Sequence, residues 1–142
     1  MLTLVDSNVL LDVIGADAVW EDWSAQALAQ SARDGDLCIN AIVYAEVSAN
    51  FATMEEADLA LPENFFPRLP IPMEAAFLAG KAFVRYRRGG GTRTCALPDF
   101  FIGAHAAVAN IRLLTRDAAR YRTYFPRIEI ICPSQQESKP TP

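Results

Sequence analysis

Short apolar runs alternate with stretches of helical periodicity along nearly the whole chain. Residues 2–6 form an apolar run that ends in an acid, and residues 36–40, 113–114 and 128–132 have the same short, apolar character. Between these runs, apolar residues recur three and four positions apart, as in helices, over residues 7–14, 19–34, 41–51, 53–61, 74–88, 98–110 and 117–124. A further short strand is expected around residues 69–71. This alternation predicts a three-layer α/β/α fold with a mostly parallel central sheet.

The length and composition predict a single domain. A chain of 142 residues that is 51% hydrophobic and 21% charged can bury one sizeable core. We expect this domain to span residues 1–133 and the Pro-, Ser- and Gln-containing residues 134–142 to form a flexible tail. The first residues lack the basic region of a secretory signal, and no apolar run approaches the roughly 18 residues of a membrane span. Three widely spaced cysteines fit a reducing compartment. A cytoplasmic protein without a membrane partner is therefore expected.

The net charge of −4 conceals a strong asymmetry between the two halves of the chain. Residues 1–66 contain twelve acids and one arginine, whereas residues 67–142 contain five acids and twelve bases. Such a distribution fits a polyanion bound at one surface, and it equally fits two halves that attract each other across the fold.

Four acids fall where a parallel sheet would place a ligand. Asp6 and Asp117 follow expected strands, while Glu46 and Asp99 lie in otherwise apolar helical segments. Ligands of open α/β sheets bind at the carboxyl ends of the strands. Taken singly, Asp6 and Asp99 also suit helix capping, and Glu46 suits an ion pair with an arginine.

Together, the four acids predict a metal site. Converging carboxylates repel one another unless a cation neutralises them, and their hard oxygens suit Mg²⁺ or Mn²⁺. The single histidine, His105, is expected to be a core or supporting residue rather than a metal ligand.

Four segments in order resemble the acidic motifs of PIN-domain ribonucleases. They are LVDSNVLLD at residues 4–12, AEV at 45–47, PDFFIGAHA at 98–106 and LTRD at 114–117, the last followed by Tyr121, YFP at 124–126 and IEII at 128–131. The resemblance covers about residues 1–133. The short single-domain length resembles the VapC-type toxins of toxin–antitoxin modules.

The resemblance implies a function and a set of site residues. Asp6, Glu46, Asp99 and Asp117 match the acids that hold Mg²⁺ or Mn²⁺ and catalyse cleavage of RNA through a metal-activated water. Ser7, Asn8 and Thr115 match positions that support them. A further acid that some relatives carry after the fourth is missing, since Ala118, Ala119 and Arg120 follow Asp117. The family also implies a homodimer and a cognate antitoxin.

The basic cluster after residue 80 is interpreted as an RNA-binding surface. We expect the side chains of Arg85, Arg87, Arg88 and Arg93, with the glycines at 89–91, to flank the acids and hold RNA phosphates. These cations also suit the negative end of a helix dipole. Two other functions remain open from the sequence: an RNA-processing nuclease outside a toxin–antitoxin pair, and a non-catalytic metal- or RNA-binding module.

Overall fold

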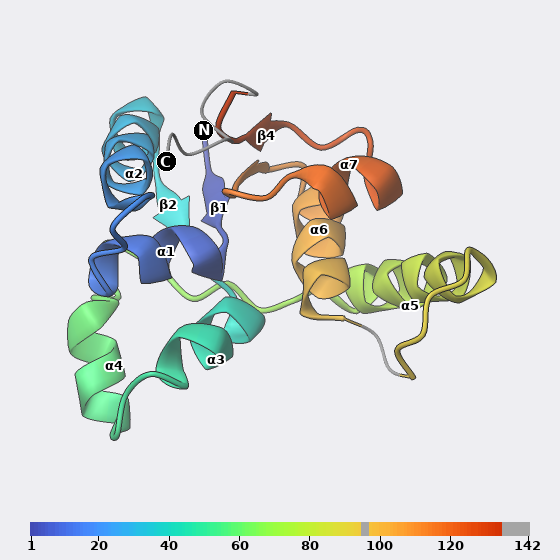
Figure 1. Ribbon diagram of the computed structural model, residues 1–142, viewed down its shortest axis with the longest axis horizontal. Helices are drawn as coiled ribbons and strands as arrows, with labels where there is room; N and C mark the ends of the chain where they lie inside the picture. Colours follow the sequence, from blue (N-terminus) through green and yellow to red (C-terminus); the bar gives the residue numbers. More distant parts are fainter. Residues whose placement is uncertain (95–96, 135–142) are drawn as a thin grey trace.

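A four-stranded parallel sheet forms the centre of the computed structural model, which describes residues 1–94 and 97–134 (Figure 1). The strands are β1 (Thr3–Val5), β2 (Leu37–Cys38), β3 (Arg112–Leu114) and β4 (Ile130–Ile131). Their order is β2-β1-β3-β4, with Leu4 paired to Cys38 on one side and to Leu113 on the other. The predicted parallel α/β fold is confirmed, and every pairing between these strands is parallel.

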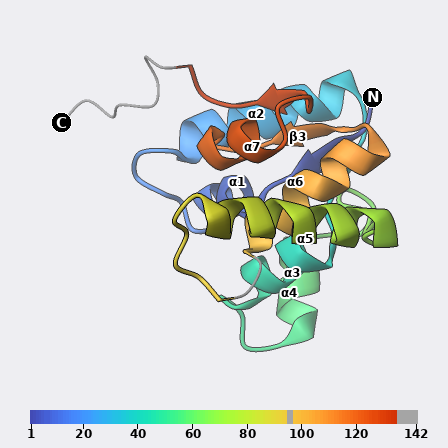
Figure 2. The same ribbon diagram turned by 90° about the vertical axis from the view of Figure 1, so that its right-hand side faces the viewer.

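Six of the seven helices in the described chain lie on two sides of this sheet. In Figure 1, one side carries α1 (Ser7–Ile14), α2 (Glu21–Asp34) and α4 (Met54–Ala60), and the other carries α5 (Met73–Arg88), α6 (Pro98–Ala109) and α7 (Ala119–Tyr124). Helix α3 (Ala41–Ser48) lies below the sheet between them. Figure 2 shows α5 crossing in front of α6, the helix it packs against most extensively.

Side-chain caps fix where three helices begin. Asp6 accepts a hydrogen bond from the Ser7 N–H at the start of α1, Asn40 from the Val43 N–H at α3, and Thr53 from the Glu56 N–H at α4. A cap of this kind satisfies a backbone donor that the helix leaves unpaired. Asp6 is therefore a helix cap as well as a candidate site residue, whereas Asp99 lies inside the first turn of α6, after Leu97.

The strand expected at residues 69–71 is absent from the described chain. Ile39 donates to the Pro67 carbonyl and accepts from the Leu69 N–H, giving a single parallel bridge between Ile39 and Arg68. Pro70 and Pro72 lack the N–H groups that would extend the ladder. The expected flexible tail at 134–142 falls outside the described residues, apart from Ser134.

The core is built around β1 and β3. Leu4, Val5, Leu113 and Leu114 are fully buried, and α6 contributes the buried Phe100. Burying a side chain of this size stabilises the fold by about 1.5–3 kcal/mol. The carboxyl ends of β1 and β3 are thereby fixed side by side, which places Asp6 next to Thr115. None of the helices in the described part of the chain is long and apolar enough to cross a membrane.

Candidate active site

Asp6 lies at the centre of the candidate site, directly after β1. Its side chain is only 4% exposed. Oδ1 accepts a hydrogen bond of 2.8 Å from the Ser7 N–H, and Oδ2 accepts bonds of 2.8 Å from the Thr115 and Tyr121 hydroxyls. Burial nonetheless raises the pKa of the Asp6 carboxyl above its usual value, although these hydrogen bonds act to lower it. The site holds a carboxylate that is short of positive charge.

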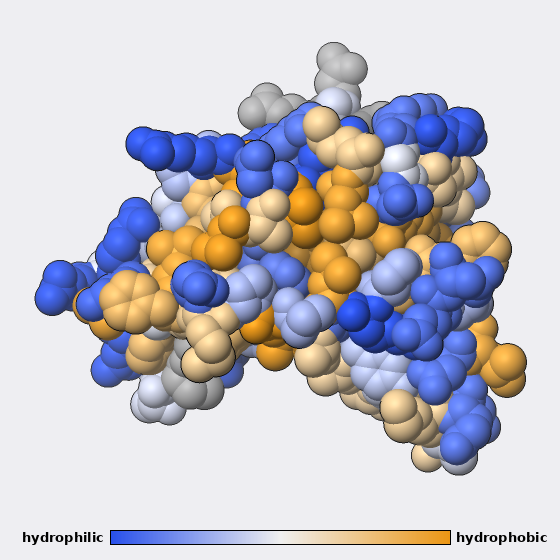
Figure 3. All heavy atoms as spheres, turned by 180° about the vertical axis from the view of Figure 1, so that it is seen from behind, coloured by the Kyte–Doolittle hydropathy of each residue, from blue (hydrophilic) through white to orange (hydrophobic). Residues whose placement is uncertain are grey.

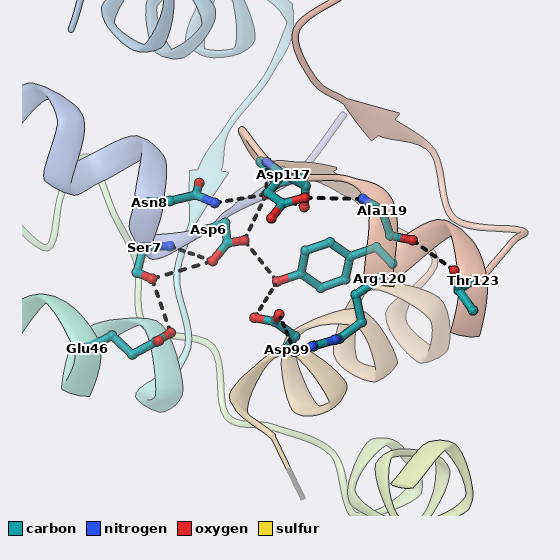
Figure 4. A network of polar contacts seen from close by, with 11 residues as sticks. Asp6, Ser7, Asn8, Glu46, Asp99, Asp117, Ala119, Arg120 and Thr123 are labelled. Carbon is teal, nitrogen blue, oxygen red and sulfur yellow. Dashed lines mark hydrogen bonds and ion pairs between the residues drawn. The ribbon is translucent and has the colours of Figure 1, made fainter. Parts of the chain in front are cut away.

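Three hydroxyl groups connect Asp6 to the segments that carry the other acids (Figure 4). The Ser7 hydroxyl lies 3.5 Å from Asp6 Oδ1 and donates to Glu46 Oε1 at 3.1 Å. The Tyr121 hydroxyl lies 3.3 Å from Asp99 Oδ1. The Thr115 hydroxyl accepts from the backbone N–H of Asp117 at 3.2 Å. Glu46 and Asp99 are thus each linked to Asp6 through one bridging hydroxyl, whereas Asp117 is linked to it through its own backbone N–H and Thr115.

Glu46 lies on α3, and the start of this helix is held by Asn40 and His105. The side-chain oxygen of Asn40, Oδ1, accepts from the Val43 N–H and so caps α3. The side-chain nitrogen Nδ2 then faces Nδ1 of His105 at 3.1 Å. His105 is 2% exposed and accepts this hydrogen bond, as expected for a supporting core residue. Burial raises the pKa of the Glu46 carboxyl, and the nearby charges of Asp6 and Asp99 act in the same direction.

The remaining two acids are more accessible. Asp99, on α6, forms an ion pair of 3.3 Å with Arg120. Asp117 is exposed and accepts from the Ala119 N–H at 3.4 Å. Among the described residues, Asp6, Glu46 and Asp117 have no ion-pair partner, so Arg120 alone compensates one of four negative charges.

A buried ion pair holds the loop that carries Thr115 and Asp117. Arg116 forms two hydrogen bonds with the Asp12 carboxylate, at 2.8 and 3.1 Å, and Ser24 donates to the same carboxylate at 2.7 Å. The backbone N–H of Arg116 also donates to Asn8 Oδ1, and Asn8 Nδ2 donates to the Thr115 hydroxyl. Helix α1 therefore fixes the end of β3 through the side chains of Asn8 and Asp12.

The chemistry of these groups fits a divalent cation. Carboxylate oxygens with uncompensated charge are the ligands that Mg²⁺ and Mn²⁺ prefer. In the described chain, no three His, Cys, Asp or Glu side chains lie close enough together to hold an ion as they stand. As they stand, the acids could hold an ion through one or two carboxylates with water completing its coordination, because the Ser7 and Tyr121 hydroxyls lie between Asp6 and its neighbours Glu46 and Asp99.

Sequence reasoning did not assign roles to four residues that the structure places around the acids. Tyr121 follows Asp117 by four positions, and Asp12 follows Asp6 by six, so each lies on the helix that starts next to an acid. For Asp12 the available signal was an acid in an otherwise apolar helical segment, whereas Tyr121 lies in a mostly polar helix that offers no such signal. Arg116 and Arg120 were counted only as part of the basic half of the chain.

The four arginines predicted to bind RNA occupy different settings. The Arg85 guanidinium lies 5.4 Å from the centre of the Tyr124 ring, and Tyr124 lines a hollow together with Asp99 and Asp117. Arg87 donates to the Arg93 carbonyl at 2.8 Å and so holds the loop after α5. Arg88 and Arg93 are exposed. Their role in RNA binding remains a prediction.

The PIN domain family matches residues 3–126, which is most of the chain. The chain belongs to the PIN domain family, and the resemblance seen in its acidic motifs is confirmed. No curated protein sequence matches it significantly.

Solved structures with the same fold are similar at low sequence identity. VapBC2 from Rickettsia felis, bound to a DNA fragment from its promoter, is 17% identical, with a TM-score of 0.72 over 94% of this chain and 100% of that chain. VapBC-1 from nontypeable Haemophilus influenzae is 16% identical, with a TM-score of 0.70 over 93% and 98%. DNA-bound VapBC from Salmonella typhimurium is 20% identical, with a TM-score of 0.61 over 93% and 98%. These similarities establish the fold.

Proposed function

We propose that this protein is a Mg²⁺- or Mn²⁺-dependent endoribonuclease that acts as the toxin of a type II toxin–antitoxin pair. The observation that carries the proposal is the grouping of Asp6, Glu46, Asp99 and Asp117 around three hydroxyl groups, with the buried Asp6 and the half-buried Glu46 lacking an ion-pair partner among the described residues. Structural carboxylates are normally compensated where they are buried. An uncompensated group at the strand ends of a PIN domain supports a cation-dependent reaction.

The four acids would hold the cation, and the surrounding residues would keep them in place. A bound divalent ion supplies positive charge to a phosphodiester and lowers the pKa of a water molecule. Ser7, Thr115 and Tyr121 orient the Asp6 carboxylate through direct hydrogen bonds. Asn8 acts one step further out, by donating to the Thr115 hydroxyl.

Cleavage of a mixed pool of structured RNAs tests the proposal. The purified protein is incubated with the pool in Mg²⁺, in Mn²⁺ or in EDTA, beside the variants Asp6→Asn and Asp99→Asn. Asp22→Asn is the matched control, because Asp22 is exposed on α2. We expect cleavage that needs metal, survives Asp22→Asn and is lost in the other two variants.

Metal titration completes the test. A folded protein that neither cleaves the pool nor binds a divalent cation would contradict the nuclease proposal and favour a non-catalytic module. Cleavage unaffected by EDTA would contradict the role given to the four acids. Cleavage that depends on them would support the nuclease and leave its place in a toxin–antitoxin pair to be tested separately.

The surface supports the proposed protein partners. Phe65, Met73 and Phe77 are exposed by 64–81%, and apolar surface gathers on the back of the molecule (Figure 3). A hollow of about 520 Å³ beside α3 and α4 is lined by Tyr44, Met54 and Leu69, among others. Exposed apolar area of this kind marks protein interfaces. We propose that this exposed apolar surface forms the contacts of a homodimer and of a cognate antitoxin in the cytoplasm.

Solution mass and growth measurements separate these partners. Light scattering should give twice the chain mass, and Phe77→Glu should reduce it. Expression of the protein alone should arrest growth, whereas Asp6→Asn should not. A monomer, or growth arrest equal for both proteins, would contradict the corresponding proposal.

A further inference from the structure

A hollow of about 400 Å³ lies directly beside two of the acids. It is enclosed by the ends of α5, α6 and α7 and by the segment between β3 and α7. Its lining includes Tyr86, Asp99, Asp117, Arg120, Thr123 and Tyr124. A molecule seated here would be next to the groups that the proposed function places at the reacting phosphodiester.

One wall of the hollow is aromatic. The buried Phe100 ring meets Tyr86 edge-on at 5.7 Å between ring centres and Tyr124 at 5.1 Å. The Arg120 guanidinium lies 6.0 Å from the centres of the Tyr86 and Phe100 rings. Aromatic rings and guanidinium planes are the surfaces on which unpaired nucleobases stack.

The polar groups of the hollow complement a nucleotide. Within the described part of the chain, the Tyr86 and Tyr124 hydroxyls make no hydrogen bond, so both are free to bind a ligand. Arg85, stacked on Tyr124, supplies positive charge at the rim for a phosphate.

The loop after α5 packs against the Tyr86 ring. The Gly91 backbone packs so closely on the Tyr86 ring that a Cβ atom at Gly91 would lie 2.2 Å from Cε1. Arg87 fixes the same loop through its bond to the Arg93 carbonyl. The glycine loop and Arg87 thus have a positioning function that the sequence did not reveal.

We propose that this hollow is a subsite for one unpaired nucleotide of the RNA, whose base lies against the Tyr86–Tyr124 wall and whose phosphate faces Arg85. The inference rests on the proposed ribonuclease function and adds to it the residues that would hold one nucleotide beside the cleaved bond. A fully paired helix keeps its bases stacked and cannot place one here.

Filling the hollow tests the subsite. Ala119 is exposed at the start of α7 and lines the hollow, so Ala119→Leu occupies it without disturbing the core. Ala25→Leu, on an exposed position of α2, is the matched control. The measurement is kcat and KM for Mn²⁺-dependent cleavage of a short single-stranded RNA of mixed sequence, and of the same strand annealed to its complement.

We expect single-stranded RNA to be cleaved and the duplex to be resistant. Ala119→Leu should raise KM by about tenfold, the size of effect that loss of one base-stacking contact produces. Tyr86→Phe with Tyr124→Phe should keep the rings but weaken the preference for the base beside the cut. Melting temperatures of all variants confirm folding, and anisotropy of a labelled single strand on the Asp6→Asn background gives an independent affinity.

The other outcomes would contradict the subsite, and they distinguish its failure from failure of the proposed ribonuclease function. Equal KM for Ala119→Leu and Ala25→Leu, with active wild type, would overturn the subsite but leave the ribonuclease. Duplex cleaved as well as single strand would do the same. Absence of both RNA cleavage and RNA binding in the wild type would overturn the proposed function and the subsite together.

Discussion

Tyr121 donates its hydroxyl proton to Asp6 Oδ2 at 2.8 Å, across 115 residues of sequence. The Tyr121 hydroxyl oxygen also lies 3.3 Å from Asp99 Oδ1, so this one hydroxyl lies between two acids. Its single proton can satisfy only one of them, and the shorter distance assigns it to Asp6.

Tyr121→Phe should therefore destabilise the protein. Tyr121 is 1% exposed, and removal of a hydrogen bond to a charged group costs about 1.5–3 kcal/mol. Urea denaturation of the metal-free protein measures the loss. Tyr44→Phe is the control, because the Tyr44 hydroxyl donates to the exposed Asp58 carboxylate at 2.7 Å, and it should cost much less. Equal urea midpoints for the two variants would contradict the importance of the buried contact.

Two helical glycines should respond in opposite directions to alanine. A Cβ atom at Gly103 would lie 2.4 Å from the Phe125 ring and 3.0 Å from the Tyr121 ring, so Gly103→Ala should cost about 1–3 kcal/mol through overpacking. Gly80 has open space around it on α5, and Gly80→Ala should stabilise by about 0.5–1 kcal/mol. Melting temperatures should fall for the first variant and rise for the second. Any rise for Gly103→Ala would show that α6 and α7 do not pack as described.

The fold and the four acids could be predicted from local patterns, whereas the connections between them could not. Apolar runs and caps such as Asn40 act within a few residues, so the sequence displays them directly. The bond between Tyr121 and Asp6 and the pair of Asp12 with Arg116 join distant segments, and only the folded chain reveals them. The strand expected at 69–71 does not form, because the prolines there lack the N–H groups that a strand needs. The apolar pattern alone does not reveal this.

The ion pair between Asp12 and Arg116 should be worth more than an exposed pair. The Asp12 side chain is 4% exposed and that of Arg116 is 30% exposed, and removal of one partner from a buried pair costs about 3–5 kcal/mol, less here because Arg116 is partly solvated. We expect Asp12→Asn to lose about 2–3 kcal/mol in urea denaturation. Asp34→Asn is the matched control, since Asp34 is 43% exposed and lies 3.8 Å from Arg112. A loss no larger than that of the control would contradict the role of the pair in holding the Asp117 loop.

Without metal, the Asp6 and Glu46 carboxyls should contribute less stability as the pH rises. Burial raises the folded-state pKa of the Asp6 and Glu46 carboxyls above their unfolded values. Their contribution is therefore fully present below about pH 4 and is lost as the pH rises through the raised pKa values. Divalent metal at neutral pH should restore stability, because it binds the deprotonated carboxylates.

Melting temperature against pH in EDTA provides the measurement. Asp6→Asn removes one of the two titrating groups, so its curve should fall less steeply than that of the wild type. Glu55→Gln, at an exposed position of α4, is the control and should follow the wild type. Parallel curves for Asp6→Asn and wild type would show that Asp6 does not titrate with a raised pKa.

The arginines at the end of α5 should set the salt dependence of RNA binding. Each phosphate contact of a single strand contributes about 0.7 to the slope of log K against log salt concentration. Arg88 is exposed and makes no hydrogen bond or ion pair within the described residues, whereas Arg87 also holds the loop through the Arg93 carbonyl. Arg88→Ala is therefore the cleaner variant, and Arg87→Ala with Arg88→Ala should weaken binding further.

Arg33→Ala, on the opposite side of the sheet, serves as the control. Anisotropy of a labelled single-stranded RNA over a range of KCl concentrations should give a flatter slope for the α5 variants alone. An unchanged slope would mean that these cations only complement the end of their helix, as their position in its last turn also allows.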